Sequence, residues 1–139
     1  MRKEIKESRA FYLQRLADLA LLKRAVTVKN SRSSGRAGDC LAVPVGESRH
    51  GGYLEFTDLQ EAEAALRKLS IHQGFPNLRI HDTPDKYEYP IFTLCWGDLQ
   101  DRIMSVEELG RYYGYKEEAI KQEIEGQRRY YATKKETDC

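Results

Sequence analysis

The chain has 139 residues, of which 40% are apolar and 32% charged, and its net charge is +1. This size and composition fit one globular domain with a core of its own. The longest apolar stretch, at 19–22, is far too short to span a bilayer, and the charged residues after Met1 exclude the apolar core of a secretory signal. We therefore expect a single domain over 1–139 with no membrane contact, and 132–139 as a candidate flexible tail.

The three cysteines point to a reducing compartment. Cys40, Cys95 and Cys139 are odd in number, far apart and without the spacing of metal ligands. This pattern predicts free thiols, so we expect the protein in the cytoplasm, with no metal and no cofactor.

Charge is unevenly distributed along the chain. Residues 1–36 carry ten Lys or Arg against three acids, a net of +7, whereas residues 81–108 have a net of −5. Either these regions attract each other in the fold, or the basic start binds an anionic partner.

The first half of the chain predicts one helix and three strands. Ile5, Tyr12, Leu16 and Leu19 recur at helical spacing and indicate a helix over 3–24. Strands are expected, from β-branched and alternating residues, over 25–30, 40–46 and 53–57.

The second half predicts a capped helix and two more strands. Asp58 and Glu61 match a capping box for a helix that ends near Ser70. Strands follow at 78–82 and 87–97, and the latter is apolar on both sides. Phe92, Leu94 and Trp96 point to one side of this strand. Tyr89, Ile91 and Cys95 point to the other side.

These elements predict an α+β fold. We expect an antiparallel sheet of about five strands with an N-terminal helix, a crossover helix and a C-terminal helical hairpin. Because the strand at 87–97 is apolar on both sides, the sheet should carry helices on both faces, or have one face closed by a partner.

The segment 105–124 resembles a helix-turn-helix. Ser105 and Glu108 form a second capping box, Gly114 interrupts the helix, and a second helix follows. The first turn of that second helix contains Glu117 and Glu118, which a DNA backbone would repel. A helical hairpin packed on the sheet is therefore favoured, and a nucleic-acid-binding regulator is the alternative.

Tyrosine beside arginine is common in this region and is typical of protein–protein interface centres. Neighbouring tyrosines on a helix cannot all face one core, so some should be exposed. The residues expected to contribute to one partner-binding patch are Arg111, Tyr112, Tyr115, Arg128 and Tyr131.

Two basic loops are candidate anion sites. The glycine-bearing loop 31–39 carries Arg32 and Arg36, and the turn after 46 carries Arg49 and His50, both expected to be exposed. The loop lacks the end of a P-loop, and ordinary surface loops are the simpler interpretation.

No catalytic motif occurs in the sequence. The favoured hypothesis is a small non-enzymatic protein that binds another protein, with the profile of an inhibitor or of an anti-defence protein of a mobile element. A nucleic-acid-binding regulator that uses 105–124 is the first alternative, and a nucleotide- or phosphate-binding protein that uses loop 31–39 is the second. A homodimer is left open.

Overall fold

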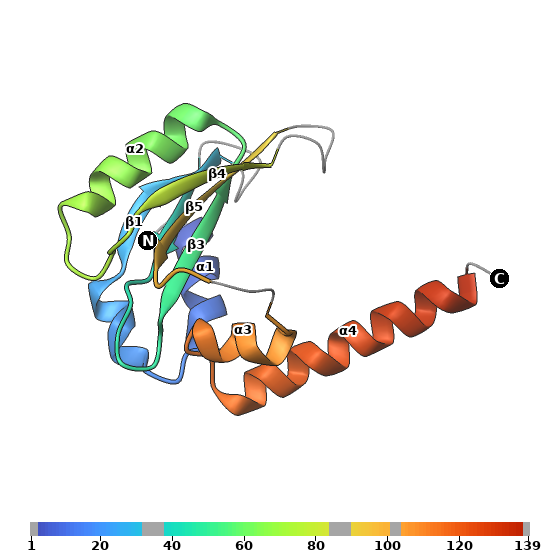
Figure 1. The fold of residues 1–139 in the computed structure, drawn as a ribbon. Helices are drawn as coiled ribbons and strands as arrows, with labels where there is room; N and C mark the ends of the chain where they lie inside the picture. Colours follow the sequence, from blue (N-terminus) through green and yellow to red (C-terminus); the bar gives the residue numbers. More distant parts are fainter. Residues whose placement is uncertain (1–2, 32–37, 84–89, 101–103, 138–139) are drawn as a thin grey trace.

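The computed structural model describes the backbone of residues 3–31, 38–83, 90–100 and 104–137, and the side chains of residues 8–31, 38–82, 90–100 and 104–128. The elements run in the order α1 (Lys3–Leu13), the 3-10 helix η1 (Leu19–Arg24), β1 (Val26–Lys29), β2 (Asp39–Ala42), β3 (Gly51–Phe56), α2 (Leu59–Ser70), β4 (Arg79–Thr83), β5 (Ile91–Gly97), α3 (Val106–Tyr112) and α4 (Glu117–Thr137). Figure 1 shows their arrangement.

The α+β class predicted from the sequence is confirmed, and all five expected strands are present. They form two antiparallel sheets, β1-β2 and β3-β5-β4, in place of one. The sheets are joined by Asn30, which follows β1 and whose amide nitrogen donates to the Glu55 carbonyl of β3 at 3.0 Å. One helix, α2, covers both sheets from the same side (Figure 1).

The core lies between α2 and the two sheets. Phe56, Leu69, Leu94 and Trp96 are fully buried there. The indole nitrogen of Trp96 donates to the Val43 carbonyl at 3.0 Å, so the one polar atom of this large side chain is satisfied. Burial of these side chains is the main stabilising contribution to the fold.

The expected helix over 3–24 is wrong in its second half. Helix α1 ends at Leu13, and η1 begins after Asp18, whose side chain accepts from Ala20 N. Between them, Leu16 forms a β-bridge with Tyr115, and Lys116 N donates to the Arg15 carbonyl at 2.7 Å. These contacts require extended backbone, so tertiary pairing interrupts a segment whose apolar spacing is helical.

The two expected capping boxes have different outcomes. At α3, Ser105 and Glu108 bond each other's backbone N–H in both directions, as predicted. At α2, Asp58 accepts from Gln60 N, but the Glu61 carboxylate bonds the backbone and hydroxyl of Ser31. Glu61 therefore holds the start of loop 31–39 instead of completing the box.

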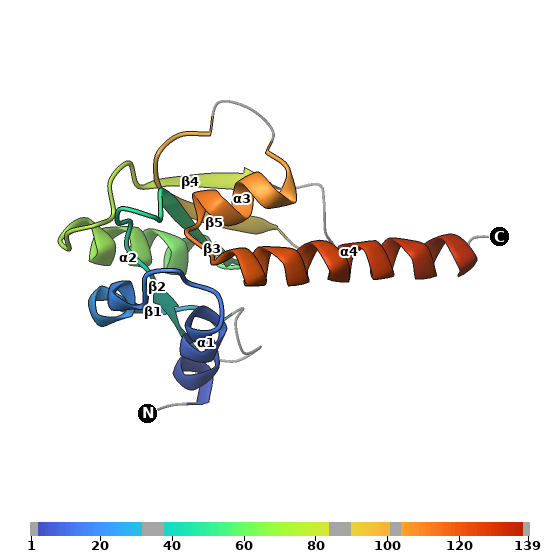
Figure 2. The ribbon, with the colours of Figure 1, turned by 90° about the horizontal axis from the view of Figure 1, so that it is seen from below.

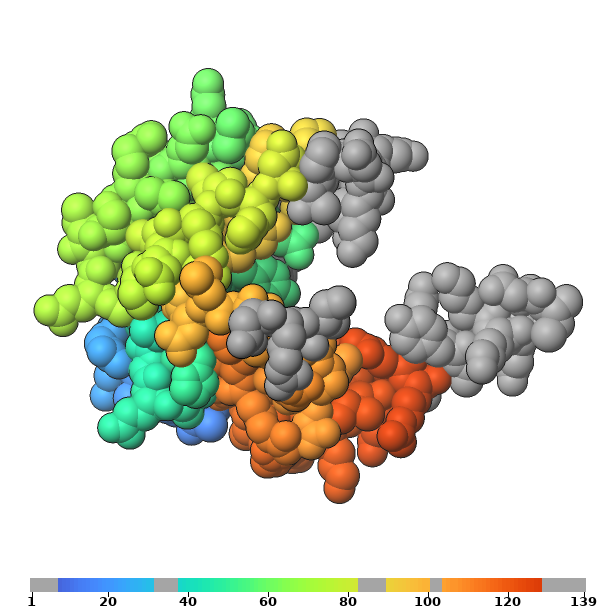
Figure 3. Space-filling view, viewed as in Figure 1, coloured from blue at the N-terminus to red at the C-terminus, as the bar shows by residue number. Residues whose placement is uncertain are grey.

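Helix α4 is the longest element and runs to Thr137, through most of the segment considered as a tail. Its first half packs beside α3 at the lower right of the space-filling view (Figure 3). Figures 1 and 2, seen from two directions, show the helix leading away from the rest of the chain.

Candidate functional site

The candidate site lies on the face of the three-stranded sheet that points away from α2. Side chains that are in register on neighbouring strands share one face of a sheet. The register therefore gives two rows on this open face: Tyr53–Cys95–Arg79 and Glu55–Thr93–His81.

The expectation that β5 is covered along both faces holds only in part. Leu94 and Trp96 are fully buried on the core face, and Ile91 is 2% exposed on the other face, but Thr93 and Cys95 on that same face are only half-buried. Tyr89 falls outside the described residues. The alternative, a partner that closes this face, stays a prediction.

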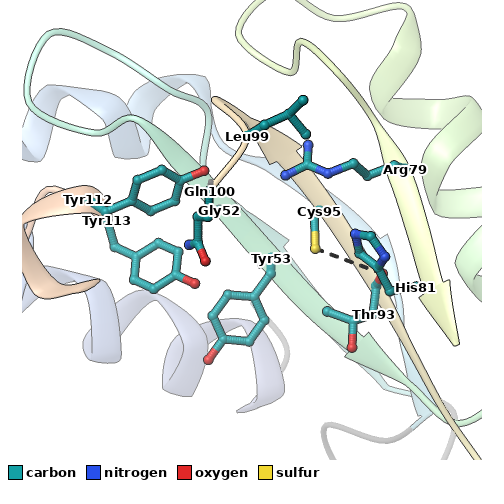
Figure 4. A pocket seen from close by; sticks show the side chains of 10 residues that line it. All are labelled: Gly52, Tyr53, Arg79, His81, Thr93, Cys95, Leu99, Gln100, Tyr112 and Tyr113. Atoms are coloured by element: carbon teal, nitrogen blue, oxygen red, sulfur yellow. Dashed lines mark hydrogen bonds between the residues drawn. The ribbon is translucent and has the colours of Figure 1, made fainter. Parts of the chain in front are cut away.

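A hollow of about 390 Å³ lies on the open face, between the strands and α3 (Figure 4). We call it the tyrosine groove and define it by six of its lining residues: Tyr53, Arg79, His81, Cys95, Tyr112 and Tyr113. Figure 4 shows the tyrosines on one side and Arg79 and His81, from β4, on the other. The groove thus has an aromatic wall and a basic wall.

The aromatic wall is a connected cluster of rings. The Tyr113 ring lies 5.4 Å from the Tyr53 ring, 5.2 Å from Tyr112 and 6.0 Å from Tyr115, measured between centroids. Burial raises the pKa of Tyr53 and Tyr113. Their hydroxyls therefore stay protonated at neutral pH and can donate hydrogen bonds to a bound group.

Tyr112 is held at the end of the groove by the first residue of β3 and the segment after β5. Its hydroxyl donates to the Asp98 carbonyl, and it closely approaches Gly51. A Cβ at Gly51 would collide with this ring, so a glycine is needed there. Asp98 also lies 3.5 Å from the ring nitrogen of His50.

Arg49 is the buried residue that positions Tyr113. It is 1% exposed; its guanidinium donates to the Tyr113 carbonyl at 2.9 Å and to the Val43 carbonyl at 3.3 Å. Its charged group lies 5.6 Å from the Tyr12 ring centroid and 5.9 Å from that of Tyr113. A buried guanidinium among aromatic faces and carbonyls ties the N-terminal helix to the helical hairpin.

A second hollow, of about 290 Å³, adjoins the groove and shares Tyr53 and Tyr113 with it. Its other side is formed by α1 and α4, which contribute Phe11 and Glu123. Tyr115 lies between these helices, with its ring 6.5 Å from that of Phe11. Aromatic side chains therefore continue from the sheet to α1.

The only described thiol in the groove is not activated. Burial raises the pKa of Cys95, and Arg79 opposes this effect only in part. At neutral pH the group is therefore a thiol, and the nucleophilic form is the thiolate. Among the described residues, no His, Cys, Asp and Glu side chains gather in a group that could hold a metal.

The structure describes part of the predicted partner-binding patch. Tyr112 and Tyr115 are joined through Tyr113, and Arg111 is bonded to Glu107 at 2.7 Å and Glu117 at 3.1 Å. These carboxylates, Glu117 foremost, raise its pKa. Arg128 is exposed further along α4, and the Tyr131 side chain is outside the described part.

Of the four residues predicted to bind an anion, the structure describes Arg49 and His50. The expectation that Arg49 is exposed is wrong, because its guanidinium is committed to two backbone carbonyls beneath Gly52 and Gly114. His50 is exposed, as expected, beside the Asp98 carboxylate. Arg32 and Arg36 lie outside the described residues, so a phosphate site in loop 31–39 stays a prediction.

The two helices and the glycine turn expected over 105–124 are present. Helices α3 and α4 meet at Gly110, where a Cβ would lie 2.5 Å from Ile120, and Gly114 turns the chain with φ +75°. Glu117 and Glu118 occupy the first turn of α4, in the place where a recognition helix meets DNA.

Five of the six residues that define the groove were not predicted as site residues from the sequence: Tyr53, Arg79, His81, Cys95 and Tyr113. Strand alternation already put Tyr53 opposite Leu54 and Phe56, which was a usable signal. Arg79 and His81 follow the same alternation on β4, but only the strand order places them beside Tyr53.

No described helix combines the length and the apolar content that crossing a bilayer requires. No curated protein and no solved structure matches the chain. One family does match, over residues 5–138, nearly the full length. The chain therefore belongs to DUF6302, a family of unknown function.

Proposed function

We propose that this protein is a non-enzymatic binding protein that takes a protein partner in the tyrosine groove. The observation that carries the proposal is the open sheet face: Tyr53 is 41% exposed on a strand whose other side belongs to the core. Aromatic residues that are exposed or half-buried around a hollow, next to a basic side chain, have the composition of interface hot spots.

The chemistry of the groove supports binding over catalysis. Cys95 has a raised pKa, and the defining residues of the groove include no carboxylate that could act as a base. Arg79 is fixed in place by its donation to the Asn77 carbonyl at 2.7 Å. A guanidinium group held beside tyrosine hydroxyls suits ligand recognition rather than catalytic turnover.

The two walls define the anchor that a partner should supply. An aromatic or long apolar side chain can pack on Tyr53 and Tyr113, and a neighbouring carboxylate can pair with Arg79. A protein segment offers both groups in adjacent positions. We also propose a cytoplasmic location and an inhibitory role, such as that of an anti-defence protein. Identification of the partner would test the inhibitory role.

The test is affinity capture from a lysate of the source cells, with and without nuclease. The parent chain is compared with Tyr53→Ala, and with Glu63→Ala as control, because Glu63 is exposed on α2, across the sheet from the groove. We expect one protein to be retained by the parent and by Glu63→Ala after nuclease treatment, and lost with Tyr53→Ala. Equal retention by Tyr53→Ala contradicts the proposal.

Single-stranded nucleic acid is the second candidate, because the open face combines tyrosines with Arg79 and His81. Bases stack on exposed aromatic side chains, and basic groups track the phosphates. Loss of all captured material after nuclease, together with salt-sensitive binding of a labelled single strand, would favour it. Duplex recognition by α4 is disfavoured by Glu117 and Glu118, and sequence-specific duplex binding at physiological salt would restore that alternative.

A further inference from the structure

Helix α4 has little to pack against in the described part of the chain. Ala119 and Ile120 are buried beside α3, but 121–123, 125–126 and 128 are exposed. The helix has 21 residues, about 31 Å at 1.5 Å per residue. Figure 2 shows it continuing past the other elements.

A projecting helix of this composition is poorly stable alone. Helical segments shorter than about 12–15 residues are marginal in water without packing. Gly126 lies near the middle of α4, with no other side chain or backbone within 4 Å of a Cβ placed on it. An interior glycine lowers helix stability relative to alanine. The exposed part of α4 at 121–128 therefore gains from a partner along the helix.

The charges of α4 are divided between its halves. Residues 117–126 contain four Glu and one Lys, a net of −3, and residues 127–137 contain four Lys or Arg and one Glu, a net of +3. A second α4 that runs antiparallel places each acidic half opposite a basic half. A parallel copy would place like charges together.

We propose that two copies of this chain associate through α4, with the helices antiparallel and crossing at Gly126. The glycine sits close to the midpoint of the helix, which is the point that meets itself under a two-fold axis. Its missing side chain lets the helices approach closely there, as Gly110 lets Ile120 approach within this chain. This association is independent of the tyrosine groove.

The helix dipole offers a different reason for acids near the start of a helix and bases near its end. That effect acts within one chain and requires no second copy. The two explanations separate when the charges are changed and the oligomeric state is measured.

The charge test uses two full-length variants. Glu118→Lys/Glu123→Lys makes both halves of α4 basic, and Arg128→Glu/Lys135→Glu makes both halves acidic, while the Arg111–Glu117 pair is left intact. By sedimentation velocity at low salt, we expect the parent to form a dimer that dissociates at high salt. Each variant alone should associate at least tenfold more weakly, and an equimolar mixture of the two should regain dimer.

The orientation test uses engineered disulfides in a Cys139→Ser background. Gly126→Cys should cross-link readily, because position 126 faces itself, whereas Gln122→Cys, one turn earlier, should not. Cross-linking at both positions would indicate parallel helices and overturn the proposed geometry. A monomeric parent, or variants that dimerise as the parent does, would overturn the association itself; far-ultraviolet circular dichroism confirms that every variant is folded.

Discussion

The two faces of β5 meet different surroundings. Leu94 and Trp96 are closed over by α2 and the neighbouring strands, with no exposed surface. Thr93 and Cys95, alternating with them, lie half-exposed below a hollow bordered by tyrosines. The first face packs in the core, and the second lines the groove with half-buried groups. This difference is the basis for assigning the binding function to the open face.

The largest expected effect on stability comes from truncating a side chain on the buried face of β5. Leu94→Ala should lower the free energy of unfolding by about 2–5 kcal/mol, because it leaves a cavity among fully buried neighbours. Thr93→Ala, one residue away on the open face, should change it by less than about 1 kcal/mol. Urea denaturation followed by circular dichroism measures both; equal losses would mean that the faces do not differ in this way.

Arg49 connects the buried core to the aromatic wall of the tyrosine groove, and its removal should affect both. Arg49→Ala leaves a cavity and takes the donor from the Val43 and Tyr113 carbonyls, which should cost about 2–4 kcal/mol of stability. Because Arg49 holds Tyr113, the groove should also lose its shape. Thermal melting with near-ultraviolet circular dichroism tests this, and unchanged tyrosine signals would show that Arg49 does not order the wall.

High pH should lower the free energy of unfolding, because buried groups with raised pKa values lose their protons. Burial raises the pKa of Cys40 from 9.0 to about 11 and that of Tyr12 from 10.0 to about 12. The unfolded chain releases these protons first, so their contribution to stability is complete below about pH 9 and is lost as pH rises to about 12. The slope is about 1.4 kcal/mol per pH unit for each group.

Urea midpoints measured from pH 8 to 12 test this dependence. Tyr12→Phe, which keeps the ring and removes the ionisable hydroxyl, should flatten the part of the fall that lies above pH 10. A Tyr12→Phe profile parallel to that of the parent would contradict the assignment of the effect to buried groups.

Elements with local signals could be predicted from the sequence. Helix α2 begins at Leu59 after the Asp58 cap and ends at Ser70, and α3 begins after the Ser105 capping box, as expected. The hairpin turn at Gly114 was also predicted. Each depends on residues within a few positions of one another, where helix capping and glycine geometry act directly.

What the sequence did not predict depends on contacts between distant segments. The helix expected over 3–24 is interrupted because Arg15 and Leu16 pair with 115–116. Arg49 is buried because α1, the segment after β2 and the helical hairpin converge on it, and no residue near it in the sequence signals that. The groove arises from the strand order β3-β5-β4, which sets Tyr53 and Arg79 on either side of Cys95.

The smallest expected effect on folding coincides with the largest expected effect on binding, at Tyr53. Tyr53→Ala removes a partly exposed ring and should change the free energy of unfolding by about 0.5 kcal/mol or little more. The same change should weaken binding of the captured protein by about 2 kcal/mol, roughly thirtyfold in Kd.

Isothermal titration calorimetry of that purified partner against the parent, Tyr53→Ala and Glu63→Ala tests directly whether the groove binds the partner. We expect parent-like affinity for Glu63→Ala and about thirtyfold weaker binding for a Tyr53→Ala chain with a parent-like melting temperature. Parent-like affinity for a folded Tyr53→Ala chain would contradict the proposal.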